Sequence, residues 1–99
     1  MKITVVGLGK IGLPLAVQFA SQGHEVLGAD VNAATVATIN SGQEPFPGEA
    51  HLQEKLARVV GNGRLKAVTD TATAAAESDA VVVAGTSRHI LRQARWSGP

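Results

Sequence analysis

Cysteine is absent from this chain of 99 residues. Its absence excludes disulfide bridges, thiolate-bound zinc and a cysteine nucleophile within these residues. Aromatic side chains are also scarce, since Phe19, Phe46 and Trp96 are the only three. A hydrophobic core therefore has to be built from Val, Ile, Leu and Ala.

The chain also lacks a strong net charge and a long apolar run. Nine Lys and Arg residues against eight Asp and Glu give a formal net charge of +1, which does not indicate nucleic acid or a membrane surface as a partner. No stretch approaches the ~20 apolar residues that cross a bilayer. The apolar start at residues 2–6 resembles a signal peptide only faintly, because Gly7 and Gly9 interrupt it at once. We expect a cytoplasmic protein with neither a nucleic-acid nor a membrane partner.

What is present is a balanced globular composition, with 44% hydrophobic and 17% charged residues, in a length that suits one small domain. Short β-branched runs alternate with segments of helical periodicity. Strands are expected at residues 2–6, 25–30, 65–69 and 80–84, and helices at 11–22, 33–40, 49–60 and 71–77, with a Pro- and Gly-rich loop at 41–48. This alternation predicts the α/β class: a Rossmann-type parallel sheet, incomplete, with strand order 3-2-1-4 and flanking helices.

Local signals mark the ends of several expected helices. Pro14 falls in a first turn, where a missing N–H matters least. Gly23 suits the left-handed residue that ends the same helix. Asn32 is a good N-cap for the next helix, and either Asp70 or Thr71 can cap the last one.

Residues 7–12 read G-L-G-K-I-G, directly between the first expected strand and the first expected helix, and match the pattern G-x-G-x-x-G. Gly7 permits the tight turn, Gly9 lacks the side chain that would block a pyrophosphate, and Gly12 lets the helix pack closely on the strands. The N–H groups at about residues 10–13 would face a diphosphate, with the positive end of the helix dipole behind them. This pattern predicts a dinucleotide-binding site.

Asp30 ends the second expected strand, 18 residues after Gly12. A carboxylate at this point accepts hydrogen bonds from the hydroxyls of the adenosine ribose. The same charge would repel the 2′-phosphate of NADP, and no Arg follows within the next few residues. The predicted cofactor is therefore NAD.

The sequence also leaves purely structural interpretations of these residues open. The glycines could shape only a tight turn, and Asp30 could only cap the next helix. Lys10 could touch a phosphate or point into solvent. His24 and His51 are interpreted as surface residues, and His89 lies in the expected tail with no visible partner. No spacing suggests a nucleophile–base pair, so no catalytic and no metal-binding residue is assigned.

Four segments together resemble the UDP-glucose/GDP-mannose dehydrogenase family. They are G-L-G-K-I-G-L-P-L-A at 7–16 with D-V-N at 30–32, the loop I-N-S-G-Q-E-P-F-P-G-E at 39–49, the strand at 65–70 that ends in Thr-Asp, and S-D-A-V-V-V at 78–83. The resemblance covers roughly residues 1–86. It implies an NAD-dependent enzyme that oxidises the C6 alcohol of a nucleotide sugar to a carboxylate in two hydride transfers.

The resemblance also implies particular cofactor contacts. By position in the family, Gly9, Ile11 and Asp30 would touch the cofactor, and Thr86 matches a threonine that approaches it from the end of the fourth strand. Together with the glycine motif, the predicted cofactor-binding residues are Gly7, Gly9, Lys10, Ile11, Gly12, Asp30 and Thr86.

The chain departs from the family pattern in several places. Thr35 stands where the family has a Lys shortly after the acid, and Ser87 stands where it has a proline. The family's catalytic cysteine, its supporting residues and the domain that binds the nucleotide sugar lie far beyond residue 99. We therefore expect a truncated or excised cofactor domain without turnover, which binds NAD weakly and ADP-ribose nearly as well.

Two expectations concern the C-terminal part. Residues 87–99 break the strand–helix pattern, so we expect an NAD-binding domain at 1–86 and a divergent, disordered tail at 87–99. Without a further strand, residues 80–84 would present an apolar sheet edge that permits self-association. The alternatives are the N-terminal domain of another NAD-dependent dehydrogenase, such as a hydroxyacid or 6-phosphogluconate type, and a non-catalytic dinucleotide-binding or interaction module.

Overall fold

The computed structural model describes residues 1–46 and 50–84. The expected tail at 87–99 and the predicted contact Thr86 lie outside these residues. Within them, no helix combines the length and the apolar character that a membrane crossing requires.

Four parallel strands form one sheet in the order β3-β2-β1-β4. The strands are β1 (Lys2–Val6), β2 (Glu25–Ala29), β3 (Leu65–Val68) and β4 (Ala80–Val83). The helices are α1 (Gly12–Ser21), α2 (Ala33–Asn40), α3 (Ala50–Gly61) and α4 (Thr71–Ala76). The predicted fold class, strand order and element order are confirmed, and no element bound differs from the sequence-based one by more than one residue.

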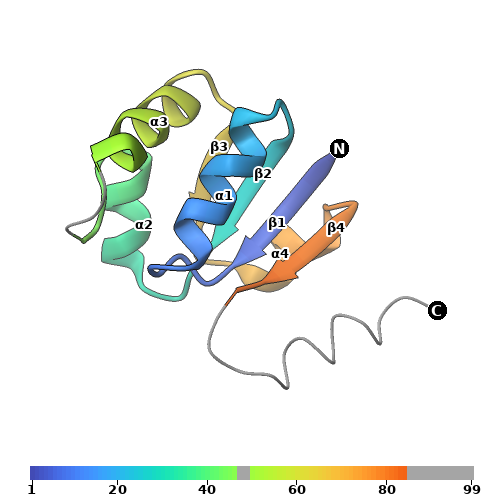
Figure 1. Cartoon of the computed structure of the whole chain (residues 1–99). Coiled ribbons are helices and arrows are strands. Elements are labelled where there is room, and N and C mark those ends of the chain that lie inside the picture. The colour runs from blue at the N-terminus through green and yellow to red at the C-terminus, as the bar shows by residue number, and fades with distance from the viewer. Residues whose placement is uncertain (47–49, 85–99) are drawn as a thin grey trace.

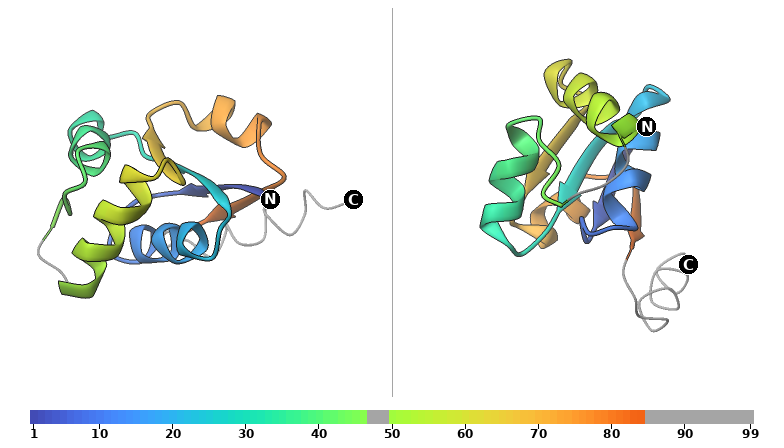
Figure 2. Two further views of the ribbon diagram at one scale, coloured as in Figure 1. Left: turned by 90° about the horizontal axis from the view of Figure 1, so that it is seen from above. Right: turned by 60° about the vertical axis from the view of Figure 1, so that its left-hand side comes forward.

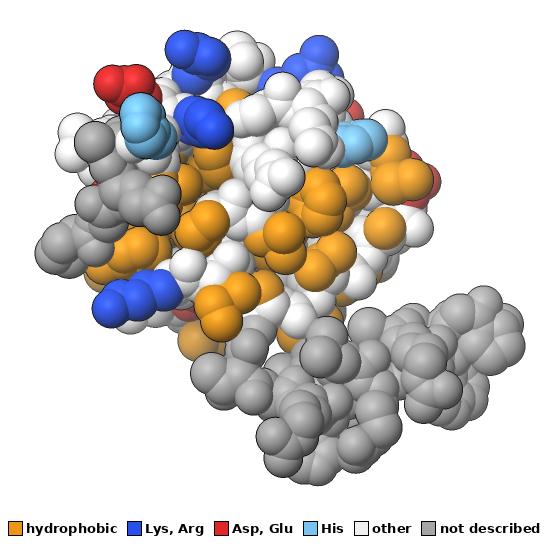
Figure 3. Space-filling view, viewed as in Figure 1, with side chains coloured by type: hydrophobic (Ala, Val, Ile, Leu, Met, Phe, Trp, Pro, Cys, Tyr) orange, Lys and Arg blue, Asp and Glu red, His pale blue; other side chains and the backbone are white. Residues whose placement is uncertain are grey.

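The helices form layers around the sheet. Helices α1 and α3 lie on one face, α4 covers part of the opposite face, and α2 lies beside the outer edge of β3 (Figures 1 and 2). Apolar side chains gather in the middle of the face that Figure 1 presents, and charged side chains lie mainly at its margin (Figure 3). Helix α1 contains no charged residue, which matches its place against the core.

The core is aliphatic, as the scarcity of aromatic residues predicts. Val5, Leu13, Ile39 and Leu56 are fully buried, each from a different element. The two phenylalanines are only partly buried and pack against the outside of this cluster.

Caps confirm two of the predicted helix starts. The side chain of Asn32 accepts a hydrogen bond from the Thr35 N–H at 3.1 Å and caps α2. Asp70, rather than Thr71, caps α4 by accepting from the Thr73 N–H at 3.1 Å. Gly23 follows Gln22, the C-cap of α1, and has φ +98°, as a left-handed terminating residue requires.

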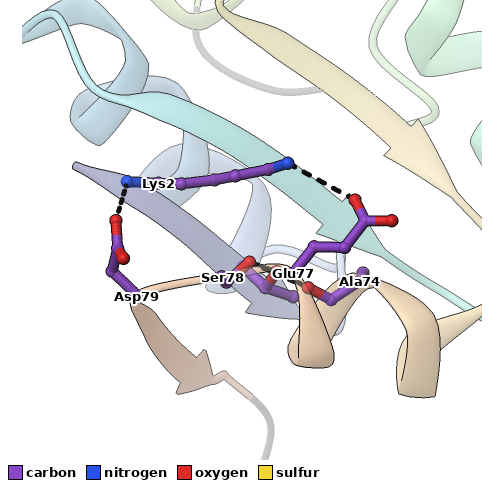
Figure 4. A network of polar contacts seen from close by, with 6 residues as sticks. Lys2, Ala74, Glu77, Ser78 and Asp79 are labelled. Carbon is purple, nitrogen blue, oxygen red and sulfur yellow. Dashed lines mark hydrogen bonds and ion pairs between the residues drawn. The ribbon is translucent and has the colours of Figure 1, made fainter.

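Polar contacts join α4 to β1. The buried Thr4 hydroxyl donates to the Ala74 carbonyl at 2.9 Å and also contacts the Ser78 hydroxyl. Lys2 extends between two acids (Figure 4): its backbone N–H donates to Asp79 Oδ2 at 2.9 Å, and its Nζ lies 3.3 Å from Glu77 Oε1. These contacts hold α4 against the sheet.

The two edges of the sheet differ. On β3, the Asn40 side-chain amide donates to the Ala67 carbonyl at 2.9 Å and accepts from the Ala67 N–H at 2.8 Å. This amide therefore occupies the place of a neighbouring strand. On the other side, β4 pairs with β1 alone among the described strands, and its four apolar residues are only half-buried.

Candidate functional site

The turn from β1 into α1 is built around two glycines that the chain itself requires. Gly7 has φ +92°, and a Cβ atom on it would stand 2.3 Å from the Ala84 carbonyl oxygen. A Cβ atom on Gly12 would stand 1.6 Å from the Gly7 carbonyl oxygen and 3.2 Å from the Ala84 Cβ. The first and last glycines of the motif therefore serve the packing of the turn itself.

Gly9 differs from both. A Cβ atom on Gly9 would meet nothing within 4 Å, and its φ is not in the left-handed region. Neither backbone conformation nor internal packing explains a glycine here. Its missing side chain keeps the space beside the loop open, which suits the close approach of a ligand to the backbone.

The loop also presents backbone donors. No acceptor within residues 1–46 and 50–84 takes the N–H of Gly9, Lys10, Ile11 or Gly12, and no side chain caps α1. The expectation that Leu13 also offers its N–H is wrong, because this group donates to the Gly9 carbonyl at 3.0 Å and closes the first helical turn. The helix end thus places its dipole and its free N–H groups one residue earlier than predicted.

Asp30 stands beside the loop at the carboxyl end of β2. Its Oδ2 accepts from the Leu8 N–H at 3.0 Å, and its Oδ1 accepts from the Asn32 N–H at 2.9 Å. Asn32, not Asp30, caps α2, so capping does not account for the acid. Each carboxylate oxygen keeps further acceptor capacity for a ligand hydroxyl.

The sequence-predicted residues meet around one hollow of about 360 Å³. Its lining comprises Gly7, Leu8, Gly9, Lys10, Ile11, Gly12, Asp30 and Ala84. Six of the seven predicted cofactor contacts are in this set, and the seventh, Thr86, lies outside the described residues. Lys10 is exposed at the rim, and Ile11 is 63% exposed there despite its apolar side chain.

Sequence reasoning missed two parts of the lining, Leu8 and Ala84. Leu8 carried a signal, since it is the apolar residue between two glycines of the motif. Ala84 carried none, because its place beside Gly7 follows from the pairing of β4 with β1, far apart in the sequence. Both have aliphatic side chains without a reactive group.

The arrangement is suited to binding. A helix N-terminus with free N–H groups holds a diphosphate, and a neighbouring carboxylate holds a pair of ribose hydroxyls. Among the described residues, no three His, Asp or Glu side chains cluster as metal ligands do. The described part of the site thus offers backbone donors and a carboxylate placed to hold a dinucleotide.

Comparison with known proteins agrees with this geometry. The family model for the NAD binding domain of the UDP-glucose/GDP-mannose dehydrogenase family matches residues 1–89. GDP-mannose 6-dehydrogenase of Pseudomonas putida is 38% identical over 83 residues, which are 84% of this chain and 19% of that protein. UDP-glucose 6-dehydrogenase of Rhizobium meliloti is 41% identical over 86 residues, which are 85% of this chain and 19% of that protein.

Solved structures show the same similarity. A ternary complex of GDP-mannose dehydrogenase from Pseudomonas aeruginosa superposes with a TM-score of 0.82 at 34% identity, over 87% of this chain and 20% of that one. The chain therefore spans about a fifth of the length of the relatives it matches.

Proposed function

This chain belongs to the UDP-glucose/GDP-mannose dehydrogenase family, and on that premise we propose that it is the NAD-binding part of a nucleotide-sugar 6-dehydrogenase. The enzyme as a whole would oxidise the C6 alcohol of a UDP- or GDP-sugar to the carboxylate. Bound NAD supplies the hydride acceptor for this reaction. The domain assigned to this role comprises residues 1–86.

The space at Gly9 is the observation that carries this proposal. The turn requires glycine at positions 7 and 12, whereas neither packing nor backbone conformation in the described residues requires glycine at position 9. Free N–H groups and the Asp30 carboxylate border the same hollow. The contacts we assign to NAD are Gly7, Gly9, Lys10, Ile11, Gly12, Asp30 and Thr86.

The charge of Asp30 favours NAD over NADP. A carboxylate that accepts hydrogen bonds from ribose hydroxyls repels a phosphate at the same place, and residues 31–36 contain no Arg or Lys to offset that repulsion. NADP should therefore bind more weakly than NAD.

We propose further that this chain binds NAD without turning over a sugar nucleotide. It contains no cysteine, and no catalytic residue is assigned within it. The relatives named above act on different sugars, so the proposal stays at the level of UDP- and GDP-sugars. A cytoplasmic location stays a prediction from the sequence.

The contrast between the sheet edges supports a proposal about self-association. The β3 edge is closed by Asn40, whereas β4 offers four apolar residues and no charge. Strands of this kind pair readily with other chains. We propose that two copies of this chain associate through β4.

Calorimetric titration with NAD, NADP and ADP-ribose tests the proposed function. Wild type should bind NAD and ADP-ribose with similar affinity and NADP more weakly. Asp30→Ala should weaken NAD binding roughly tenfold or more, since hydrogen bonds to a charged group are lost. Asp30→Asn, the matched control, keeps the shape and one acceptor and should discriminate less against NADP. Failure of a folded wild-type chain to bind NAD would refute the proposal.

A further inference from the structure

Gly28 occupies the interior of β2, two residues before Asp30. Glycine weakens a strand unless something else requires it, such as a close approach by another group. Its φ is not in the left-handed region, so any residue could adopt this backbone conformation. Gly28 is buried, and the lack of space for a side chain is the remaining reason for a glycine here.

The Leu8 side chain fills that space. A Cβ atom on Gly28 would stand 2.8 and 2.9 Å from the two Leu8 Cδ carbons and 3.4 Å from its Cγ. Leu8 is 1% exposed, so its isobutyl group has no solvent into which it can turn. The Leu8 side chain thus occupies the place that a side chain at position 28 would need.

Leu8 also links Gly28 to Asp30, the acid assigned to the ribose. Leu8 is the residue whose N–H donates to Asp30 Oδ2 at 3.0 Å. The next residue is Gly9, which borders the open space of the loop. Leu8 therefore contacts β2 twice: its side chain occupies the space beside Gly28, and its N–H holds one oxygen of the Asp30 carboxylate.

We propose that Gly28 is a positioning residue for the recognition of ribose hydroxyls. By leaving room for the Leu8 side chain, it fixes the Asp30 carboxylate at the distance from the glycine loop that a ribose diphosphate spans. This inference rests on the proposed NAD-binding function. An alanine at position 28 displaces Leu8 and lengthens the bond from its N–H to Asp30. Recognition of the ribose hydroxyls then falls, while the loop N–H groups continue to bind a diphosphate.

Calorimetric titration with ADP and 2′-deoxy-ADP separates these two effects, because the ligands differ only in one ribose hydroxyl. Wild type should prefer ADP roughly tenfold. Gly28→Ala should bind both ligands and lose most of this preference. The double variant Leu8→Ala with Gly28→Ala removes the clash and keeps the position 8 N–H, so its preference should return to within about twofold of wild type. Gly61→Ala is the matched control, since a Cβ atom there would meet nothing within 4 Å.

Hydrogen exchange of the position 8 amide supplies a readout without ligand. After correction for intrinsic rates, it should be slow in wild type, about tenfold faster in Gly28→Ala, and slow again in the double variant. If a folded wild-type chain binds neither NAD nor ADP, the proposed function is refuted. If wild type binds and Gly28→Ala keeps the full ADP preference and slow exchange, only the role of Gly28 is refuted. If Gly28→Ala lowers the affinity for ADP and for 2′-deoxy-ADP equally, Gly28 has only a structural role and the inference is likewise refuted.

Discussion

The carbonyl oxygen of Gly7 lies 1.6 Å from the point where a Cβ atom on Gly12 would stand. These two glycines bring the end of β1 and the start of α1 into direct backbone contact. Gly9, between them, has free space instead. The three glycines of one motif therefore serve two purposes, and substitution separates them.

Gly12→Ala should destabilise the domain by about 3 kcal/mol or more, because backbone atoms have to move to admit the methyl group. Gly9→Ala should leave the unfolding temperature nearly unchanged and abolish detectable NAD binding, because its methyl group enters the ligand's space. Thermal unfolding followed by circular dichroism, together with calorimetric titration, checks both. Tight NAD binding by a folded Gly9→Ala variant would contradict the assigned role of Gly9.

Acid should weaken α4 through its cap. Hydrogen bonds from the Thr73 hydroxyl and the Thr73 N–H hold the pKa of Asp70 below its ordinary value of 3.8. Because the pKa is lower in the folded state, the stabilisation is present above pH 3.8 and is lost as the pH falls through the folded pKa. Asn32 caps α2 in the same way without titrating, which makes it a matched control.

Urea unfolding midpoints at pH 7 and pH 3 measure the difference. Asp70→Ala should lower the midpoint at pH 7 and have a smaller effect at pH 3. Asn32→Ala should cost about 1 kcal/mol at both values. Equal effects of Asp70→Ala at the two pH values would show that its charge does not contribute.

Asn40→Ala should open the β3 edge. The variant loses both hydrogen bonds to Ala67, which should cost about 1–2 kcal/mol of unfolding free energy. It should also raise the tendency to aggregate, since an unpaired edge strand is exposed. Unfolding and light scattering measure these effects. Asn62→Ala, which loses a single bond to the Arg64 N–H in an exposed turn, should have the smaller effect on both.

Val81→Lys should prevent association through β4. Ala80 and Val82 pack against the core cluster, so the alternation of a strand directs Val81 to the other face of the sheet, where it is half-buried beside the edge. A lysine there places a charge next to the strand that would pair. Wild type should show a mass that rises with concentration in light scattering, and the variant should stay monomeric. Ala37→Lys, which adds the same charge on an exposed part of α2, should associate like wild type. A wild-type chain that is monomeric at every concentration would rule out the β4 interface.

The strand order could be predicted from the general topology of doubly wound sheets. The sequence by itself determined the element order and the residues expected around the hollow. These follow from local patterns: β-branched runs, helical periodicity, and glycines and an acid at a set spacing around a strand and a helix. They depend on neighbours in the chain, so they can be deduced without knowing distances. The caps at Asn32 and Asp70 belong to the same local class.

Only the tertiary structure decided which contacts give these patterns their roles. Thr4 donates a hydrogen bond to Ala74, 70 positions away in the sequence. Gly28 in β2 leaves room for the side chain of Leu8, which lies in the loop after β1. The distinction between Gly9 and its two neighbouring glycines depends on the Gly7 and Ala84 carbonyls, which no spacing reveals. Such contacts arise when separate segments pack together. The distances in these contacts depend on how the whole core packs. A short-range sequence pattern can therefore identify a residue but not the atoms that it contacts.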